Sequence, residues 1–309
     1  MQAIMLIFEG ASRTYSLLEK VPVLGRLLDI YTSSAILFLR ATSASYVAPG
    51  SDLSKRPKKL LKLYEYEGCP YCRKVREALS HLDLDVEIRP CPKEIMNPLQ
   101  APNESRFRAE VKKMGLEPKF PILVDDNTGT VMQESEKIVE YLWKNYGDKA
   151  TPDLAYKLGR LLDFMPYMML PTLFRPKLSH GLLRVPSKAP AQPLELWSFE
   201  SSPFARLVRE ALCVLEIPYT LRNIAHNAVA KRKDYRRRFG DKLSSIRKAT
   251  FSTTVQVPLL IDPNTGVEML ESADIVKYLY TTYQEGPPVL DTWLSMKAPK
   301  HITNGPKSD

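Results

Sequence analysis

The chain has 309 residues, enough for two or three compact domains, and 44% of them are hydrophobic, which excludes global disorder. The 13 glycines and 25 prolines form no repeated tripeptide, which excludes a fibrous chain, and four cysteines are too few for a disulfide scaffold. The formal net charge of +9 is concentrated between His226 and Lys248, where nine Lys or Arg accompany two Asp. The rest of the chain is nearly neutral, so no general affinity for nucleic acid is indicated.

Residues 1–53 are predicted to form an N-terminal helical extension. Apolar residues recur at helical spacing over residues 17–39, but charged residues interrupt any run long enough to cross a bilayer. We expect one or two amphipathic helices that pack on the following domain or, alternatively, contact a membrane peripherally. A secretory signal fits Met1–Phe8 poorly because no basic segment precedes it. Acidic residues weaken a transit peptide, so we expect a cytoplasmic protein, with the plastid as the alternative.

The chain repeats itself. Leu61–Cys91 aligns without gaps on Leu194–Ile224, with identical residues at twelve of 31 positions. After four extra residues in the second copy, Phe120–Asp125 aligns with Val257–Asp262, and further matches continue to the end of each copy. We therefore expect two homologous domains, at residues 54–150 and 187–285. A helical and proline-rich linker would occupy 151–186, and a tail 286–309.

Both copies predict the same order of elements, β-α-β-α-β-β-α. An apolar strand is followed by a helix with hydrophobic residues at helical spacing, and an Asn-x-Gly turn closes a hairpin. Ser135 is a good N-cap for the last helix. The expected strands of the first copy are 60–66, 86–89, 122–124 and 130–133, and the expected helices are 72–83, 104–114 and 135–146. This order predicts an α/β fold with a four-stranded mixed sheet flanked by helices in each copy.

The sequence Cys69-Pro70-Tyr71-Cys72 lies where a strand turns into a helix. Backbone N–H groups and the helix dipole favour a thiolate there, so Cys69 is a candidate nucleophile and Cys72 a candidate resolving thiol. Structural cysteines, an iron–sulfur cluster shared between subunits, and a zinc site completed by Cys91 and His81 are the alternatives, and no metal is expected. Cys91 and Cys213 are expected to be a free thiol and a helix core residue.

The element order, the Cys-Pro-Tyr-Cys motif, Pro121 before a strand and Glu134-Ser135 before the last helix together resemble the glutaredoxin and glutathione transferase N-terminal branch of the thioredoxin fold. The resemblance covers both copies and implies two tandem thioredoxin-like domains. It also implies a cis Pro121, a Phe120 backbone that pairs with the cysteinyl part of glutathione, and a γ-glutamyl end held by Glu134 and Ser135. Ser135 could instead be only a helix cap.

The second copy departs from this pattern at both cysteines. Ser202 and Ala205 replace them, so thiol–disulfide exchange cannot run there. A degenerate site would retain Pro258, Glu271 and Ser272, together with Val257 before the proline. Either this copy is a binding or scaffold module, or Ser202 donates a hydrogen bond to a glutathione thiolate, as in some glutathione transferases.

The resemblance and the motif together predict a glutathione-dependent thiol–disulfide oxidoreductase with glutathione as co-substrate and disulfide or glutathionylated substrates as partners. A glutathione transferase or isomerase is the first alternative, weakened because no large all-helical domain follows either copy. A non-enzymatic tandem interaction module is the second. The basic segment Lys231–Lys248 is either a solvated helix face or, because Tyr235 and Phe239 are interleaved with its cations, a docking site for an acidic partner, a membrane surface or RNA. No nucleic-acid motif accompanies it.

Overall fold

The computed structural model describes residues 22–93, 105–164, 167–173, 175, 181, 183–246 and 255–285. Four sequence predictions therefore lie partly or wholly outside the described residues, the linker among them. The other three are the beginning of the N-terminal extension, the tail, and the last two cations of the basic segment, Arg247 and Lys248. The proline-rich linker is described only in part.

The first copy follows the element order expected from the sequence. Its first helix begins with a proline, where the missing N–H has no intrahelical partner to lose. In its hairpin, Asp125 Oδ1 accepts a hydrogen bond of 2.8 Å from the N–H of Asn127, and Gly129 has the positive φ that the turn requires. The elements are β1 (Leu61–Glu65), α3 (Pro70–His81), β2 (Val86–Pro90), α4 (Arg106–Lys113), β3 (Ile122–Asp125), β4 (Thr130–Gln133) and α5 (Ser135–Tyr146).

The second copy repeats this order, including the Asp262 to Asn264 turn bond at 2.9 Å. Its elements are β5 (Leu194–Ser198), α8 (Pro203–Val214), β6 (Tyr219–Asn223), α9 (Val229–Ile246), β7 (Leu259–Asp262), β8 (Val267–Leu270) and α10 (Ser272–Tyr283). Helical elements precede each copy. They are α2 (Pro22–Leu39) and η1 (Ser51–Leu53) before the first, and α6 (Leu154–Leu161), η2 (Tyr167–Met169) and α7 (Leu170–Leu173) before the second.

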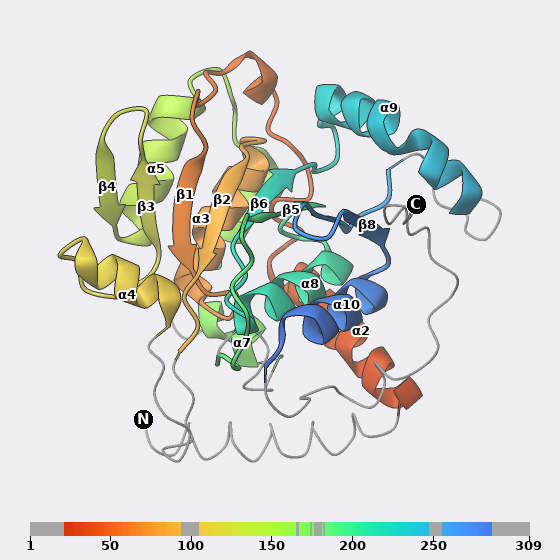
Figure 1. The fold of residues 1–309 in the computed structure, drawn as a ribbon. Helices are drawn as coiled ribbons and strands as arrows, with labels where there is room; N and C mark the ends of the chain where they lie inside the picture. Colours follow the sequence, from red (N-terminus) through yellow and green to blue (C-terminus); the bar gives the residue numbers. More distant parts are fainter. Residues whose placement is uncertain are drawn as a thin grey trace.

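The two expected four-stranded sheets are joined into one sheet of eight strands, in the order β4-β3-β1-β2-β6-β5-β7-β8 (Figure 1). The prediction of a separate sheet in each copy was therefore wrong. The edge strands β2 and β6 pair antiparallel, with Glu87 opposite Thr220, which occupies the same position in the other copy. Pairing satisfies the open N–H and C=O groups of both edges, and its register relates the copies by an approximate twofold axis.

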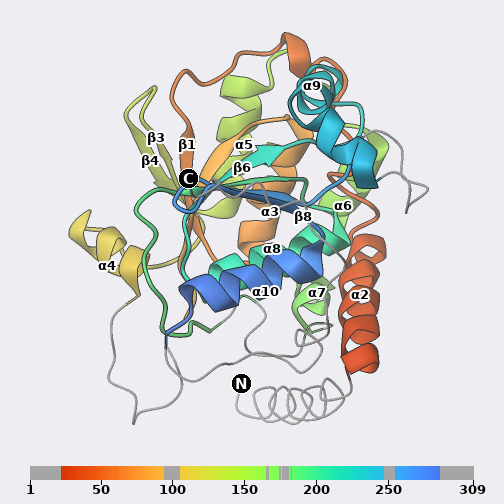
Figure 2. The same ribbon diagram turned by 45° about the vertical axis from the view of Figure 1, so that its right-hand side comes forward.

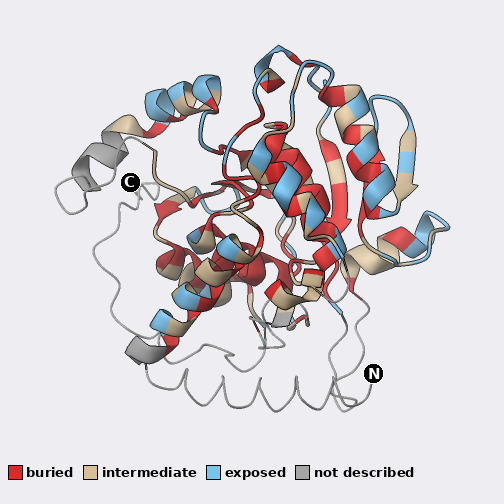
Figure 3. Ribbon diagram, turned by 180° about the vertical axis from the view of Figure 1, so that it is seen from behind, coloured by how far each residue is buried: buried red, intermediate tan, exposed pale blue. Residues whose placement is uncertain are grey.

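Helices cover both faces of this sheet. Residues of α3, α5, α8 and α10 share one large buried cluster with alternate residues of the central strands. On the opposite face, α4 packs beside Tyr64 and α9 packs on Trp197, each in a smaller cluster. Figure 2 shows α8 and α10 beneath the sheet and α2 outside them, and Figure 3 shows that buried residues concentrate in the sheet and the helices packed on it.

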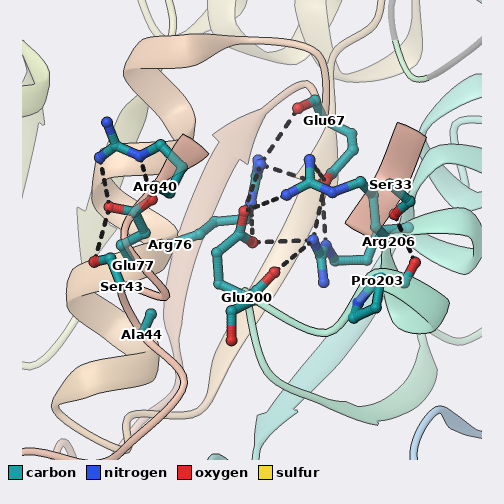
Figure 4. A network of polar contacts seen from close by, with 12 residues as sticks. Ser33, Arg40, Ser43, Ala44, Glu67, Arg76, Glu77, Glu200, Pro203 and Arg206 are labelled. Carbon is teal, nitrogen blue, oxygen red and sulfur yellow. Dashed lines mark hydrogen bonds and ion pairs between the residues drawn. The ribbon is translucent and has the colours of Figure 1, made fainter. Parts of the chain in front are cut away.

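A buried ionic network joins the two copies where α3 meets α8 (Figure 4). Arg76 and Arg209 occupy equivalent positions in the repeat, as do Glu67 and Glu200. Arg76 Nε donates to Glu200 at 2.8 Å, and Arg209 Nη2 donates to Glu67 at 3.0 Å, so each arginine binds the carboxylate of the other copy. Arg76 also binds Glu65 of its own copy. The two copies are thus joined by reciprocal ion pairs as well as by the apolar contacts of the sheet.

The helical segments that precede the two copies are joined by ion pairs in the same way. Arg40, just after α2, binds Glu77 of α3 at 2.8 Å and Asp163, just after α6, at 2.9 Å. Arg175, just after α7, binds Glu210 of α8 and, at 2.7 Å, Asp29 of α2. Each arginine therefore ties its own segment to a thioredoxin-like helix and to the other segment, so the structural repeat extends into the helices before each copy.

Candidate active site

Cys69 stands at the corner between β1 and α3, as the sequence predicted. It is the N-cap residue of α3, and its Sγ accepts a hydrogen bond of 3.3 Å from the backbone N–H of Cys72. Pro70 begins the helix, and Cys72 lies within its first turn, fully buried. The corner therefore places both sulfurs of the motif beside the positive end of the helix dipole.

The environment of the two thiols separates their acidities. Burial disfavours the Cys69 thiolate, but hydrogen bonds from Cys72, from the Tyr66 hydroxyl and from the N–H of Tyr71 outweigh burial and lower the pKa of Cys69 to about 7. Burial, with the hydrogen bond and charge of Cys69, raises the pKa of Cys72 well above its ordinary value. Near neutral pH, Cys69 is thus the thiol that ionises, and Cys72 stays protonated beneath it.

A cavity of about 500 Å³ opens beside Cys69. Only 1% of Cys69 is exposed, but the residue forms part of the cavity wall. Among the lining residues that the structure describes, three are cations and none is acidic, so this wall suits an anionic ligand. The lining consists of Tyr66, Cys69, Tyr71, Lys93, Arg108, Pro118, Lys119 and Phe120.

Sequence reasoning identified Cys69 and Phe120 of this lining and missed the cations. Arg108 of α4 is held by hydrogen bonds to the carbonyls of Pro92 (2.8 Å) and Cys91 (3.0 Å), and its guanidinium lies 4.8 Å from the centre of the Phe120 ring. Lys119 directly precedes Phe120, forms an ion pair with Glu117 at 2.5 Å and lies within electrostatic range of Glu134. The positions of Arg108 and Lys119 in the sequence form no recognisable motif with Cys69. The two residues come close to Cys69 only because α4 and the strand that follows it fold beside the corner between β1 and α3.

The segment around Phe120 has the backbone that the family resemblance implied. The Phe120–Pro121 peptide bond is cis, and Cys69 Sγ lies 4.0 Å from the Phe120 carbonyl oxygen. No other hydrogen bond to the Phe120 backbone is found within the described residues. Its N–H and C=O are therefore available to a ligand beside the sulfur.

Glu134 and Ser135 lie at the start of α5. The N-cap of this helix is Glu134, and Ser135 is its first residue, so the expectation that Ser135 is the N-cap was wrong by one position. Glu134 is exposed and has a φ of 77°, and the equivalent Glu271 has a φ of 70°. A non-glycine residue rarely adopts this conformation, so its occurrence in both copies indicates a constraint beyond helix capping.

The comparison with protein families gives one match, described as "Glutathione S-transferase, N-terminal domain". It covers residues 63–150 and again 196–288, together more than half of the chain. The chain belongs to this family. Comparisons with curated proteins and with solved structures gave no match. The cis proline, the strained residue before the last helix and the anionic-ligand cavity thus lie within a glutathione S-transferase N-terminal domain.

The second glutathione S-transferase N-terminal domain keeps the backbone of the site. The Val257–Pro258 peptide bond is cis, and Ser202 caps α8, its Oγ accepting a hydrogen bond of 3.3 Å from the N–H of Ala205. Ser272 is buried at the first position of α10, after Glu271. All the residues predicted for a degenerate second site therefore occupy positions equivalent to those of the first domain.

The side chains around this second site differ in chemistry from those of the first. Phe199 stands in place of Tyr66, so no phenol hydroxyl is available, and Val47 packs with Phe199 in a buried apolar cluster that Val257 also contacts. Gln256 replaces Lys119 and donates a hydrogen bond of 2.5 Å to the Glu271 carboxylate. At the equivalent positions, the second domain thus lacks the thiol of Cys69, the hydroxyl of Tyr66 and the positive charge of Lys119.

The remaining thiols lie away from this cavity wall. Cys91 directly follows β2 and Cys213 lies in α8, and both are buried with a pKa that burial raises. His81, named only as the fourth ligand of the alternative zinc site, stacks on Tyr156 at 4.7 Å and has its Nδ1 2.8 Å from the Tyr46 carbonyl oxygen. Within the described part of the chain, no group of three or more His, Cys, Asp or Glu is placed to hold a metal.

The basic segment Lys231–Lys248 falls mostly in α9. Its two aromatic residues, Tyr235 and Phe239, are buried against Trp197 and so are not presented to a partner. Lys231 binds Asp85 at 2.6 Å, whereas Arg237 is largely exposed. A contact with an acidic partner or a membrane at this helix stays a prediction, and it would rest on the exposed cations alone.

The Tyr66 hydroxyl gives the first testable prediction. Replacing Tyr66 with Phe removes a hydrogen bond to Cys69 that favours its thiolate, so the pKa of Cys69 should rise. Alkylation of Cys69 by iodoacetamide, followed against pH, should be half-maximal near pH 7 in the wild type and at a higher pH in Tyr66→Phe. A Tyr141→Phe variant, whose hydroxyl binds Asp125, should leave the profile unchanged. Identical profiles for all three proteins would show that Tyr66 does not tune the thiol.

Proposed function

We propose that this protein is a glutathione-dependent thiol–disulfide oxidoreductase whose nucleophile is Cys69. The observation that carries the proposal is a thiol with a pKa of about 7 in the wall of a cavity lined by three cations. Such a thiol is about half ionised at neutral pH, and a thiolate is the form that attacks a disulfide. Membership of the glutathione S-transferase N-terminal domain family supports glutathione as the ligand.

Glutathione carries two carboxylates and one ammonium group, and the cavity offers matching groups. Lys93, Arg108 and Lys119 suit the carboxylates, and exposed Glu134 suits the ammonium. The backbone of Phe120, beside the cis Pro121, would pair with the cysteinyl part. Ser135, in the first turn of α5, would bind the γ-glutamyl carboxylate with the free N–H groups of that turn.

The proposed reaction runs through a mixed disulfide. The Cys69 thiolate attacks the glutathionyl sulfur of a glutathionylated substrate, a Cys69–glutathione disulfide forms, and the substrate leaves as a thiolate that takes a proton from water. A second glutathione thiolate then attacks this disulfide, which releases oxidised glutathione and restores the Cys69 thiolate. Alternatively, Cys72 loses its proton and attacks Cys69, which releases glutathione and leaves a Cys69–Cys72 disulfide.

We propose that the second domain is a scaffold. It has no thiol at the position equivalent to Cys69, its Glu271 is engaged by Gln256, and it supplies Glu200 and Arg209 to the network behind the first domain. Ser202→Ala should accordingly leave turnover unchanged.

Two assays run in parallel test the proposed function. One measures the reduction of a small glutathione mixed disulfide by glutathione, and the other measures thioether formation between glutathione and an aromatic electrophile. We expect turnover in the first assay, and we expect Ser202→Ala to match the wild type. Turnover only in the second assay would instead support a transferase, and glutathione binding without turnover in either would support an interaction module.

A further inference from the structure

Helices α2 and α6 form an outer layer on the face of the sheet that carries α3, α5, α8 and α10, and each lies over one copy. In α2, Ser33 Oγ donates a hydrogen bond of 2.8 Å to the Pro203 carbonyl at the start of α8. In α6, the ring of Tyr156 stacks on His81 of α3, and its hydroxyl accepts a hydrogen bond of 3.0 Å from Trp143 of α5. Each helix therefore uses one side to cover a thioredoxin-like domain.

The C-terminal ends of the two helices meet. Arg40 and Asp163, which follow α2 and α6, are joined by the ion pair at 2.9 Å, and the Tyr167 hydroxyl donates to the Leu39 carbonyl at 3.0 Å. The ring of Tyr167 also stacks on Phe164 at 5.6 Å. The end of α2 and the segment after α6 are thus neighbours, and Figure 2 shows α2 and α6 along the same side of the molecule.

The outer sides of both helices expose large apolar side chains. Half of the exposed large hydrophobic residues among the described residues lie on α2, on α6 or at Phe164. Their spacing of three, four or seven residues puts them on one side of each helix. The most exposed are Leu27, Tyr31, Phe38, Leu154, Leu161 and Phe164, with exposures between 54% and 74%. We call these six residues the outer apolar face.

The exposed charged residues of α2 and α6 are cations, and Asp153, the N-cap of α6, is 28% exposed and accepts a hydrogen bond of 2.8 Å from the N–H of Tyr156. Arg26 and Lys157 are exposed on α2 and α6, whereas the single acidic residue of α2, Asp29, is 3% exposed and paired with Arg175. No acidic residue lies in α6. The half-exposed carboxylate of Glu136 in α5 is bound by Lys74 and Arg160. A partner with an apolar interior and an anionic surface would match both the outer apolar face and the cations beside it.

We propose that the outer apolar face docks on the surface of an anionic lipid membrane. Amphipathic helices bind in the interfacial plane through an apolar side and neighbouring cations, and aromatic rings such as those of Tyr31, Phe38 and Phe164 favour that depth. No helix of the described residues has the length and apolar composition needed to cross a bilayer, so α2 and α6 would lie along the surface. An acidic protein would match Arg26 and Lys157 but would leave the apolar side chains to be covered by other means.

The experiment is co-sedimentation of the full chain with vesicles of phosphatidylcholine, alone or mixed with phosphatidylserine. We expect the wild type to bind the mixed vesicles and not the neutral ones. The triple variant Tyr31→Ser, Phe38→Ser, Phe164→Ser should bind them roughly tenfold more weakly or worse, because each lost side chain removes apolar area from the contact. The control Leu53→Ser, Val229→Ser removes two side chains that are 75% and 76% exposed outside the face and should bind like the wild type.

Circular dichroism and thermal unfolding of each variant verify that the fold is retained, as expected for exposed positions. A second variant, Arg26→Gln with Lys157→Gln, leaves the apolar face intact and should weaken binding to the mixed vesicles. Three outcomes would overturn the proposal. The wild type fails to sediment with mixed vesicles, the control loses binding as strongly as the triple variant, or the wild type self-associates through this face in the absence of lipid.

Discussion

Cys69→Ser is expected to abolish reduction of a small glutathione mixed disulfide, with a loss on the order of a thousandfold or more. The hydroxyl of serine stays protonated at neutral pH, so the variant loses the one thiol among the described residues of the cavity wall, while the hydrogen bond from the Cys72 N–H can persist. The measurement is the initial rate with glutathione as reductant at pH 7.

Two matched cysteine variants sharpen this result. Cys72→Ser should keep activity on a glutathione mixed disulfide, because a second glutathione can release the first, but it should lose the internal Cys69–Cys72 disulfide. Cys91→Ser replaces a thiol that is equally buried and outside the motif, so it should turn over like the wild type. Normal turnover in Cys69→Ser would refute the assignment of the nucleophile.

Arg76→Met should destabilise the protein by about 3–5 kcal/mol, because it leaves buried carboxylates without their counter-charge. Arg76 is fully buried and binds Glu65, Glu67 and Glu200, the last of these from the other copy. Methionine is unbranched and can occupy much of the same space, so the lost ion pairs dominate the effect. Urea unfolding, followed by far-ultraviolet circular dichroism at pH 7, gives the free energy of unfolding.

Arg73 provides a matched control one helical turn earlier. It is 3% exposed, and no hydrogen bond or ion pair to its guanidinium is found among the described residues. Burial, followed by repulsion from Arg206, lowers its pKa to about 9, so it is still charged at neutral pH. Arg73→Met therefore removes an unpaired buried charge and should leave stability unchanged or raise it. Equal losses in Arg73→Met and Arg76→Met would mean that packing, and not ion pairing, governs both positions.

Local patterns in the chain were sufficient for the elements of each copy. Hydrophobic spacing predicted the helix observed at Pro70–His81, and the Asn-x-Gly turn predicted the hairpin between β3 and β4. The bounds of the helix at 135–146 were predicted correctly, but its N-cap is Glu134 and not Ser135, and the positive φ of Glu134 was not predicted. The joining of the two sheets was missed as well, since the pairing of β2 with β6 depends on two edges about 130 residues apart.

The same division holds for the candidate site. The sequence alone identified Cys69 and the cis Pro121, because a strand-to-helix corner and a family motif are readable over a few residues. Tyr66, Lys93, Arg108 and Lys119 became recognisable only when folding brought them around one sulfur. The acidity of Cys69 and the buried charge network between the copies belong to the tertiary structure, because hydrogen bonds and electrostatic energies depend on distance and burial, which residue order does not specify.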